Sequence, residues 1–371
     1  MVNLHEVTTV EGVSSLADEW GHVLSESSDR CLFLTHDWIS LWWKHFGTGR
    51  QLRVIAVRES GKLVAILPLM SFRTPVFRPV SWFKVRALQT IGDYHSNRVD
   101  LICPDLQPRY LELIWERLLQ LPGWYFLRIY PLLESSQTCT ALRQLAEGRG
   151  LQAMFIPSQS SPYINTSLGW DKFVSGISRE YRRKGRRAER DVAQEACTYR
   201  VVRGGSQLDE ELDKVFAVDA KGWAGREGTG ISSTAELRAF YRELAHLGAR
   251  KGWLSLALVE IKGELAAYQF NFNYNRKIYN LKVAYDPRFR RSSPGHVASW
   301  FGISNAFEPG AGIDEWDFLG DQDPYKLEWT QTIRSHVKVC IYRPNSLYAR
   351  FLYWLDAAPA EWVRHRVRRS R

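Results

Sequence analysis

The chain has 371 residues, a formal net charge of +10 and 24% charged residues. Its length exceeds the size at which one hydrophobic core usually divides, so we expect two domains. The 45% hydrophobic and 13% aromatic content excludes a long disordered region, and the basic balance favours a partner that carries phosphates.

The cysteines and the amino-terminal residues indicate the cellular compartment in which we expect the protein. Five cysteines are scattered along the chain without a CxxC spacing or a Cys/His cluster, which predicts no zinc site and favours a reducing environment. The first residues lack the basic and apolar segments of a signal peptide, and no run of about 18 apolar residues is found. We therefore expect a cytoplasmic protein with no metal and no transmembrane segment.

The first 160 residues predict a mixed unit of helices and strands. Residues 11–47 show helical periodicity, with a helix that begins near Thr35 or Asp37 and ends at Gly47. Two β-like runs around a turn at Gly61 predict a hairpin. The elements expected here after residue 47 are the hairpin strands 52–57 and 63–67, strands at 99–102 and 125–129, and helices at 108–121 and 138–150.

The second half follows a segment rich in Pro, Ser and Gly at 156–169, where we place the domain junction. The sequence GKLVA at 61–65 has a counterpart in GELAA at 263–267, a hint of duplication. We expect an α/β (α+β) chain of two similar halves, 1–160 and 161–371, each a mixed, mostly antiparallel sheet flanked by helices. The elements expected in the second half are helices at 170–196, 207–224, 233–252 and 294–307 and strands at 254–260, 265–274, 278–284, 315–319 and 335–342.

A basic loop from Tyr285 to His296 joins a strand to a helix. A helix amino terminus offers unpaired N–H groups and partial positive charge, and Pro294 with Gly295 leaves the backbone open to close approach. Arginines in the loop add formal charge, and together these features suit a pyrophosphate group. The alternative is an ordinary loop before a helix that starts with proline. The residues that we single out here for cofactor binding are Tyr285, Arg290, Arg291, Ser293, Pro294 and Gly295.

This loop resembles a divergent form of the GNAT acetyl-CoA motif, although Pro294 and His296 depart from its usual glycine spacing. With the runs 317–320 (DFLG) and 324–326 (PYK), most of the chain resembles the CelD-type acetyltransferases of cellulose and exopolysaccharide biosynthesis. It is also similar to the related Fem-type aminoacyltransferases. The resemblance implies two tandem GNAT-like halves, with acetyl-CoA or a longer acyl-CoA bound by the second half and the acceptor by the first.

Residues 178–190 predict a helix with six arginines at steps of three and four, which form one positive stripe. Such dense like charge favours a partner that bears phosphates, either the 3′-phosphate of CoA or a nucleic acid such as a charged tRNA. The alternative is a solvated face that Glu180 and Glu189 neutralise. The stripe residues that we assign to cofactor binding are Arg182, Arg183 and Arg186.

Two short segments hold candidate catalytic residues. Under the GNAT resemblance, Tyr325 follows the strand that splays to admit the thioester, so its hydroxyl would protonate the leaving thiolate, and Lys326 would contact donor or acceptor. Backbone N–H groups near Trp316–Leu319 would then stabilise the oxyanion. The alternative is a capped helix start with a packed tyrosine.

In the first half, Asp93 and His95 lie in a polar loop and would deprotonate an amine acceptor; the alternative is an ordinary strand entrance. The basic tail at 364–371 would contact a membrane or nucleic acid, or form a solvated end.

The resemblance thus implies an N-acyltransferase that moves an acyl group from acyl-CoA to the amine of a small molecule, sugar or peptide. Two alternatives stay open. One is an aminoacyl-tRNA-dependent transferase of the Fem type, in which the arginine stripe would grip the tRNA. The other is a non-catalytic GNAT-like pair that binds a polysaccharide or peptide.

Overall fold

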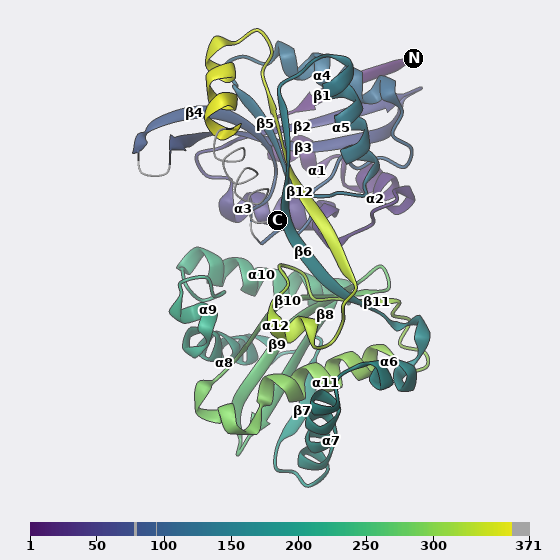
Figure 1. Cartoon of the computed structure of the whole chain (residues 1–371), viewed down its shortest axis with the longest axis vertical. Coiled ribbons are helices and arrows are strands. Elements are labelled where there is room, and N and C mark those ends of the chain that lie inside the picture. Colours follow the sequence, from purple (N-terminus) through teal and green to yellow (C-terminus); the bar gives the residue numbers. More distant parts are fainter. Residues whose placement is uncertain (78–79, 94, 358–371) are drawn as a thin grey trace, which may run out of the picture. The chain divides into compact units, whose positions relative to one another are not determined.

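The computed structural model describes residues 1–77, 80–93 and 95–357, which divide into two compact units (Figure 1). Of the described residues, unit 1 holds 1–159 and 335–357, and unit 2 holds 160–334. The chain passes from one unit to the other twice, each time inside a strand: first in β6 (Ala153–Asn165) and then in β12 (Ile333–Tyr342). The two units are therefore described one after the other.

The sheet of unit 1 has the strand order β1-β2-β3-β4-β5-β12. Its neighbours are antiparallel except β4 and β5, which run parallel over residues 87–89 and 126–128. The elements of this unit, besides β12, are β1 (Val2–Val7), α1 (Val10–Ser14), α2 (Ala17–Glu26), η1 (Leu32–Leu34), α3 (His36–Phe46), β2 (Gln51–Glu59), β3 (Lys62–Phe77), β4 (Val80–Thr90), α4 (Pro108–Gln120), β5 (Phe126–Leu133) and α5 (Gln137–Gly148).

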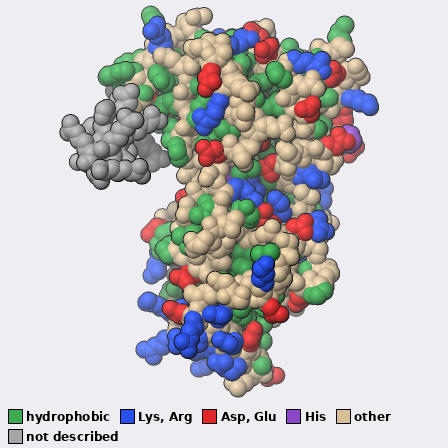
Figure 2. Space-filling model, turned by 45° about the vertical axis from the view of Figure 1, so that its right-hand side comes forward, with side chains coloured by type: hydrophobic (Ala, Val, Ile, Leu, Met, Phe, Trp, Pro, Cys, Tyr) green, Lys and Arg blue, Asp and Glu red, His purple; other side chains and the backbone are tan. Residues whose placement is uncertain are grey.

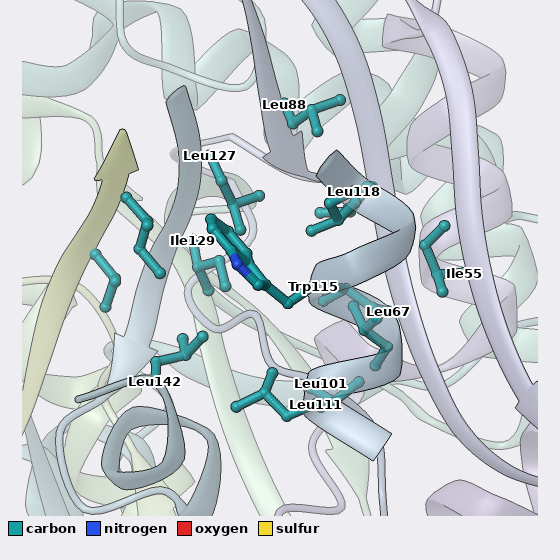
Figure 3. Close-up of a cluster of buried hydrophobic side chains, with 14 of the residues drawn as sticks. Ile55, Leu67, Leu88, Leu101, Leu111, Trp115, Leu118, Leu127, Ile129 and Leu142 are labelled. Atoms are coloured by element: carbon teal, nitrogen blue, oxygen red, sulfur yellow. The ribbon is translucent and has the colours of Figure 1, made fainter. Parts of the chain in front are cut away.

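The core of unit 1 lies where α4 and α5 cover the sheet (Figure 3). Helix α4 buries Leu111, Trp115 and Leu118, which share one face because they are spaced by three or four residues. Their partners come from β2, β3, β5 and α5, including Leu127 and Leu142. Alternate residues of β12 join the same cluster, which explains why this strand belongs to unit 1.

The sheet of unit 2 has the order β6-β11-β10-β9-β8-β7. Here too one neighbouring pair is parallel, β10 with β11, and the others are antiparallel. The elements, besides β6, are η2 (Thr166–Leu168), α6 (Trp170–Gly176), α7 (Arg179–Ala193), β7 (Thr198–Val202), α8 (Leu208–Lys221), α9 (Trp223–Arg226), α10 (Ala235–Lys251), β8 (Leu254–Ile261), β9 (Glu264–Tyr274), β10 (Lys277–Tyr285), η3 (Pro287–Ser292), α11 (Pro294–Ala306), β11 (Glu315–Asp317) and α12 (Pro324–Leu327).

The β2–β3 and β8–β9 hairpins share their turn and their irregularity. Ser60 and Gly61 have φ of 50° and 83°, and Lys262 and Gly263 have φ of 54° and 75°, the positive pair that a tight two-residue hairpin requires. The register of the first hairpin shifts between Val57 and Arg58, and that of the second shifts at the matching place. The short sequence similarity predicted between these segments is therefore also a structural one.

Several sequence predictions are confirmed by the elements. Thr35 caps α3 by accepting a hydrogen bond from the Trp38 N–H, Gly47 ends that helix, and Pro294 opens α11. The mostly antiparallel sheets with flanking helices confirm the predicted fold class. In the described residues no helix is both long enough and apolar enough to cross a membrane.

Three predictions of local structure are wrong. Residues 99–102 form no strand and contribute only an isolated bridge between Ile102 and Ile66. The Pro- and Ser-rich segment from 156 is largely strand β6, because hydrogen bonding to its neighbours β12 and β11, the latter over Tyr163–Asn165, holds it extended. The helix expected over 170–196 is two helices, α6 and α7, with the extended residues Ile177 and Ser178 between them.

Candidate active site

The candidate site in unit 2 begins where β10 and β11 part. The two strands pair only through Lys277–Tyr279 and Glu315–Asp317, yet β10 continues to Tyr285 with β9 as its only strand partner. A bulge between Asn280 and Lys282 falls directly after the last parallel pair. Such a bulge leaves one residue, Leu281, outside the ladder. The open edge of β10 thus presents backbone N–H and C=O groups that no strand satisfies.

The basic loop follows this open edge. Asp286 accepts hydrogen bonds from the N–H of Arg288 and from Lys221 Nζ, at 3.0 Å each, and its side chain is 1% exposed. Burial acts to raise the pKa of Asp286, but the hydrogen bonds from Arg288 and Lys221 outweigh it and lower the pKa to about 2. Because Arg288 also pairs with Glu264, its charge is already engaged. Asp286 and Arg288 therefore shape the loop.

Arg290 and Arg291 are differently placed. Both are exposed, and within the described part of the chain neither forms an ion pair. They stand one turn before α11, whose first residues are Pro294 and Gly295. Ser293 holds a left-handed conformation with φ of 51°, which turns the chain from η3 into α11. The loop therefore brings two unpaired cations beside a helix amino terminus.

Gly295 leaves space at this helix start. A Cβ built on Gly295 would meet only the Tyr285 ring, at 3.7 Å, an ordinary van der Waals contact. Tyr285 itself is 40% exposed. The predicted cofactor residues Tyr285, Arg290, Arg291, Ser293, Pro294 and Gly295 thus lie on one segment around the amino terminus of α11, and their binding of a pyrophosphate stays a prediction.

On the other side of the split, β11 leads through a tight loop into α12. Lys326 is 5% exposed, and its Nζ donates to the carbonyls of Leu319 and Asp321 at 2.9 and 3.0 Å and pairs with Asp323 at 2.7 Å. An ammonium group has three donors, and these contacts occupy them. We therefore assign Lys326 to holding the loop closed, and its predicted contact with a substrate stays a prediction.

Tyr325 is exposed, like the loop residues 321–324 before it, with 38% of its surface accessible. Burial of the hydroxyl region and the nearby Asp323 carboxylate raise the pKa of Tyr325 above its usual range. A phenol with a raised pKa stays protonated at neutral pH, which is the form that a general acid needs. A raised pKa also makes the phenol a weaker acid, so the role of Tyr325 as general acid stays a prediction.

The oxyanion donors predicted near Trp316–Leu319 are not available. The Phe318 N–H donates to the Pro162 carbonyl at 3.1 Å, and the Leu319 N–H donates to Asp317 Oδ1 at 2.9 Å. This part of the prediction is wrong because the strand end is paired with β6 and closed by its own carboxylate. Donors for an oxyanion are found instead along the open edge of β10, from the bulge onward. A bulge leaves no periodic signature in sequence, so these donors could not be found there.

Helix α7 carries the arginine stripe on its outer face. Tyr181, Gly185 and Ala188 face inward, and a Cβ on Gly185 would lie 2.2 Å from the Trp300 ring of α11. Figure 2 shows Lys and Arg side chains gathered at the end of unit 2 where Figure 1 draws α7. The exposed arginines of the helix are Arg179, Arg183, Arg186, Arg187 and Arg190, and Arg182 is half-buried.

The acidic residues of α7 do not neutralise this face. Glu180 pairs with Lys184 at 2.6 Å, and Glu189 accepts a hydrogen bond from Trp300 Nε1 at 3.0 Å. Arg187 alone of the stripe pairs, with Asp191. In the described residues Arg182, Arg183 and Arg186 have no ion-pair partner. The alternative considered for the stripe is therefore wrong in its ion pairs, because Glu180 and Glu189 do not pair with these arginines, whereas the exposed arginines agree with a solvated face.

His296 is a site feature that sequence reasoning missed. Its ring stacks on Trp329 at 5.2 Å and meets the edge of Tyr181 at 4.9 Å. Burial, with the neighbouring Lys184 charge, lowers the pKa of His296 to about 4, so the ring is neutral at pH 7. Its Nε2 atom is buried without a hydrogen-bond partner in the described residues. The aromatic residues that enclose it are far apart in sequence, and only the fold brings them to α11.

Asp93 and His95 belong to unit 1. The His95 N–H donates to Asp93 Oδ1 at 2.9 Å, and the His95 ring is 2% exposed and stacks on Phe46. Asp93 is half-buried and lines a hollow of unit 1. Asp93 and His95 therefore interact with each other, and Asp93 is the more accessible of the two. The role of either residue as a base stays a prediction. Tyr94 of this loop and the basic tail 364–371 lie outside the described residues.

Comparison with known proteins supports this description of unit 2. Residues 178–327 match the family described as "Acetyltransferase (GNAT) domain". The matched region contains α7, the basic loop, α11 and Tyr325. The prediction of a transferase is therefore confirmed, and residues 178–327 are its GNAT domain. No curated protein matches the sequence.

Solved structures share the fold across nearly the whole chain. FemX superposes with a TM-score of 0.62 and 13% identity, over 95% of this chain and 100% of that one. A tandem GNAT protein from the clavulanic acid biosynthesis pathway superposes with a TM-score of 0.54 and 12% identity, over 93% of this chain and 100% of that one. L-PGS from Bacillus licheniformis superposes with a TM-score of 0.52 and 11% identity, over 91% of this chain and 95% of that one. At sequence identities this low, the structural similarity shows only the fold. That fold is the one seen in tandem GNAT proteins.

Proposed function

We propose that this protein is an acyl-CoA-dependent N-acyltransferase whose donor binds in unit 2. The observation that carries the proposal is the basic loop at the start of α11, placed directly after the open edge of β10. The pyrophosphate of the donor would lie against the N–H group of Gly295, because the His296 N–H already donates to the Ser293 carbonyl at 2.9 Å, and Arg290 and Arg291 would be its counter-charges. The donor would be acetyl-CoA or a longer acyl-CoA.

The residues of the split supply the chemistry of transfer. An amine nitrogen attacks the thioester carbonyl, and N–H groups of the open β10 edge stabilise the oxygen that gains charge. The C–N bond forms as the C–S bond breaks, and Tyr325 gives its hydroxyl proton to the leaving thiolate. The amine loses its proton to a base, for which Asp93 is our candidate. The acceptor amine belongs to a sugar, a peptide or a small molecule, in line with the CelD-type resemblance.

A second candidate rests on the outer face of α7. Its unpaired arginines would suit a polyanion, so a Fem-type enzyme that takes its acyl group from aminoacyl-tRNA is the alternative. The stripe also remains our candidate for the 3′-phosphate of CoA, through Arg182, Arg183 and Arg186. These two uses differ in their ligand, so one experiment separates them.

The test is thermal unfolding of the full chain with acetyl-CoA, a long-chain acyl-CoA, CoA and aminoacyl-tRNA. A ligand at about 100 times its Kd adds about 2.7 kcal/mol to the free energy of unfolding. We expect a rise in Tm with a CoA species, lost in Arg291→Gln and kept in Arg250→Gln, an exposed arginine at the end of α10. A rise with aminoacyl-tRNA and none with any CoA species would replace this proposal by the second one.

A further inference from the structure

Unit 1 contains a hollow of about 600 Å³ whose lining is unusually cationic. Arg50, Arg128 and Lys338 contribute three positive charges, and Asp93 contributes the one carboxylate of the lining. Phe72 and Tyr130 add aromatic surface. The hollow is thus built from a charged part and an apolar part, as pockets for small molecules usually are.

Two guanidinium groups share one aromatic ring in this hollow. The Arg50 guanidinium carbon lies 5.9 Å from the centre of the Phe72 ring, and that of Arg128 lies 5.6 Å from the same centre. Arg50 also lies over Trp42 at 5.0 Å. The aromatic faces of Phe72 and Trp42 thus hold both cations at the hollow, and a cation–π contact offsets only part of the cost of taking a charge out of water.

Among the described residues neither arginine forms an ion pair with a carboxylate, although the charge of Asp93 acts on Arg50 and that of Asp356 acts on Arg128. Arg128 donates through Nε to Gln89 Oε1 at 2.5 Å, and Gln89 in turn donates to the Gly92 carbonyl at 3.1 Å. Arg50 donates to the sulfur of Met70 at 3.8 Å. Within the described residues no ion pair involves Arg50, Arg128 or Lys338. Gln89 therefore fixes the Arg128 side chain while leaving its two terminal nitrogens free.

Burial makes this arrangement costly without a counter-ion. Arg128 and Arg50 are both half-buried, and desolvation lowers the pKa of Arg128 below its usual range. Desolvation also lowers the pKa of Arg50, which the Asp93 charge opposes only in part. A cation that is partly removed from water is normally paired, and among the described residues these two have no ion-pair partner. The missing partner is an anion.

We infer that this hollow of unit 1 binds the phosphate or carboxylate group of a small molecule, held by Arg50 and Arg128. Planar guanidinium groups match such oxyanions with paired hydrogen bonds. Lys338 adds a third charge, and Phe72 and Tyr130 give an apolar wall for the remainder of the ligand. The inference concerns unit 1 alone and does not depend on the donor proposal for unit 2.

Calorimetric titration of the full chain with phenyl phosphate and with benzoate tests the inference. Benzyl alcohol serves as the neutral probe of similar size. We expect at least one of the two anions to bind, more weakly as salt rises, and benzyl alcohol not to bind. Arg128→Met and Arg50→Gln should each weaken the anion at least tenfold, whereas Arg149→Gln, whose arginine pairs with Glu116 away from the hollow, should not. Arg291→Gln should weaken CoA alone.

Thermal unfolding of Arg128→Met separates binding from a structural role. Removing a half-buried charge that has no ion-pair partner among the described residues should leave the Tm of the free protein unchanged or higher, while the gain on adding the anion disappears. Failure of both anions to bind the wild type, or equal affinity in Arg128→Met, would overturn the inference. The inference would also be overturned if Arg128→Met lowered the Tm of the free protein while Arg50→Gln bound the anion as tightly as the wild type.

Discussion

Replacing Gly295 by alanine separates folding from donor binding. The added Cβ would lie 3.7 Å from Tyr285 and meet no other atom within 4 Å, and Gly295 does not need a positive φ. Alanine is also a better helix former than glycine, by up to about 1 kcal/mol. The variant should therefore fold at least as well as the wild type.

Donor binding should respond in the opposite direction. The new methyl group would occupy the space in which a pyrophosphate approaches the N–H groups of α11. A hydrogen bond to a charged group contributes about 1.5–3 kcal/mol, so loss of one such contact weakens CoA roughly 10- to 150-fold. Isothermal titration with CoA and acetyl-CoA measures this effect directly.

The matched control for this variant is Gly148→Ala, at the end of α5 in unit 1, where a Cβ would meet no atom within 4 Å. It should fold at least as well as the wild type, by the same helix propensity, and leave the affinity for CoA unchanged. If Gly295→Ala binds CoA as tightly as the wild type, the reasoning about the start of α11 is refuted. A loss of binding accompanied by unfolding would refute the claim that the site has room.

Three further predictions concern stability. The pKa of His296 is about 4 in the folded protein and about 6.5 in the unfolded chain. The free energy of unfolding should therefore fall by up to about 3 kcal/mol as the pH drops from 6.5 to 4. Urea midpoints measure this loss, and His296→Phe should abolish it. Burial raises the pKa of Asp100 to about 7, so its contribution is lost as pH rises from about 4 through 7, and Asp100→Asn should raise the Tm at pH 8 but not at pH 4. Gly185→Ala should cost at least about 1–3 kcal/mol because its Cβ would lie 2.2 Å from Trp300, whereas Gly176→Ala, which meets open space, should cost little; equal Tm values for the two variants would contradict the described packing of α7 on α11.

The strand and helix order of unit 2 from β8 onward could be predicted because each element carries its own signal. The hairpin at Gly263 has the two-residue turn, and Pro294 marks the helix start. Strand β6 could not be predicted, since its extended conformation depends on pairing with β12 and β11, which lie about 150 residues or more later in the chain. Local composition at Pro157 and Pro162 indicated a linker instead.

The candidate site was predictable only where it is local in sequence. Arg290, Arg291 and Gly295 lie within six residues, so their charge and backbone freedom could be recognised together. The His296 cluster and the paired N–H groups of Phe318 and Leu319 depend on contacts between distant segments. The same holds for Arg50 and Arg128, which meet only at Phe72.

Hydrogen–deuterium exchange of the full chain with and without acetyl-CoA tests the central claim most directly. The claim is that the donor pyrophosphate binds at the start of α11, beside the open edge of β10. It predicts slower exchange in peptides that cover residues 281–297 when acetyl-CoA is present, and no slowing there in Gly295→Ala. Binding of acetyl-CoA that leaves exchange over 281–297 unchanged would contradict the account.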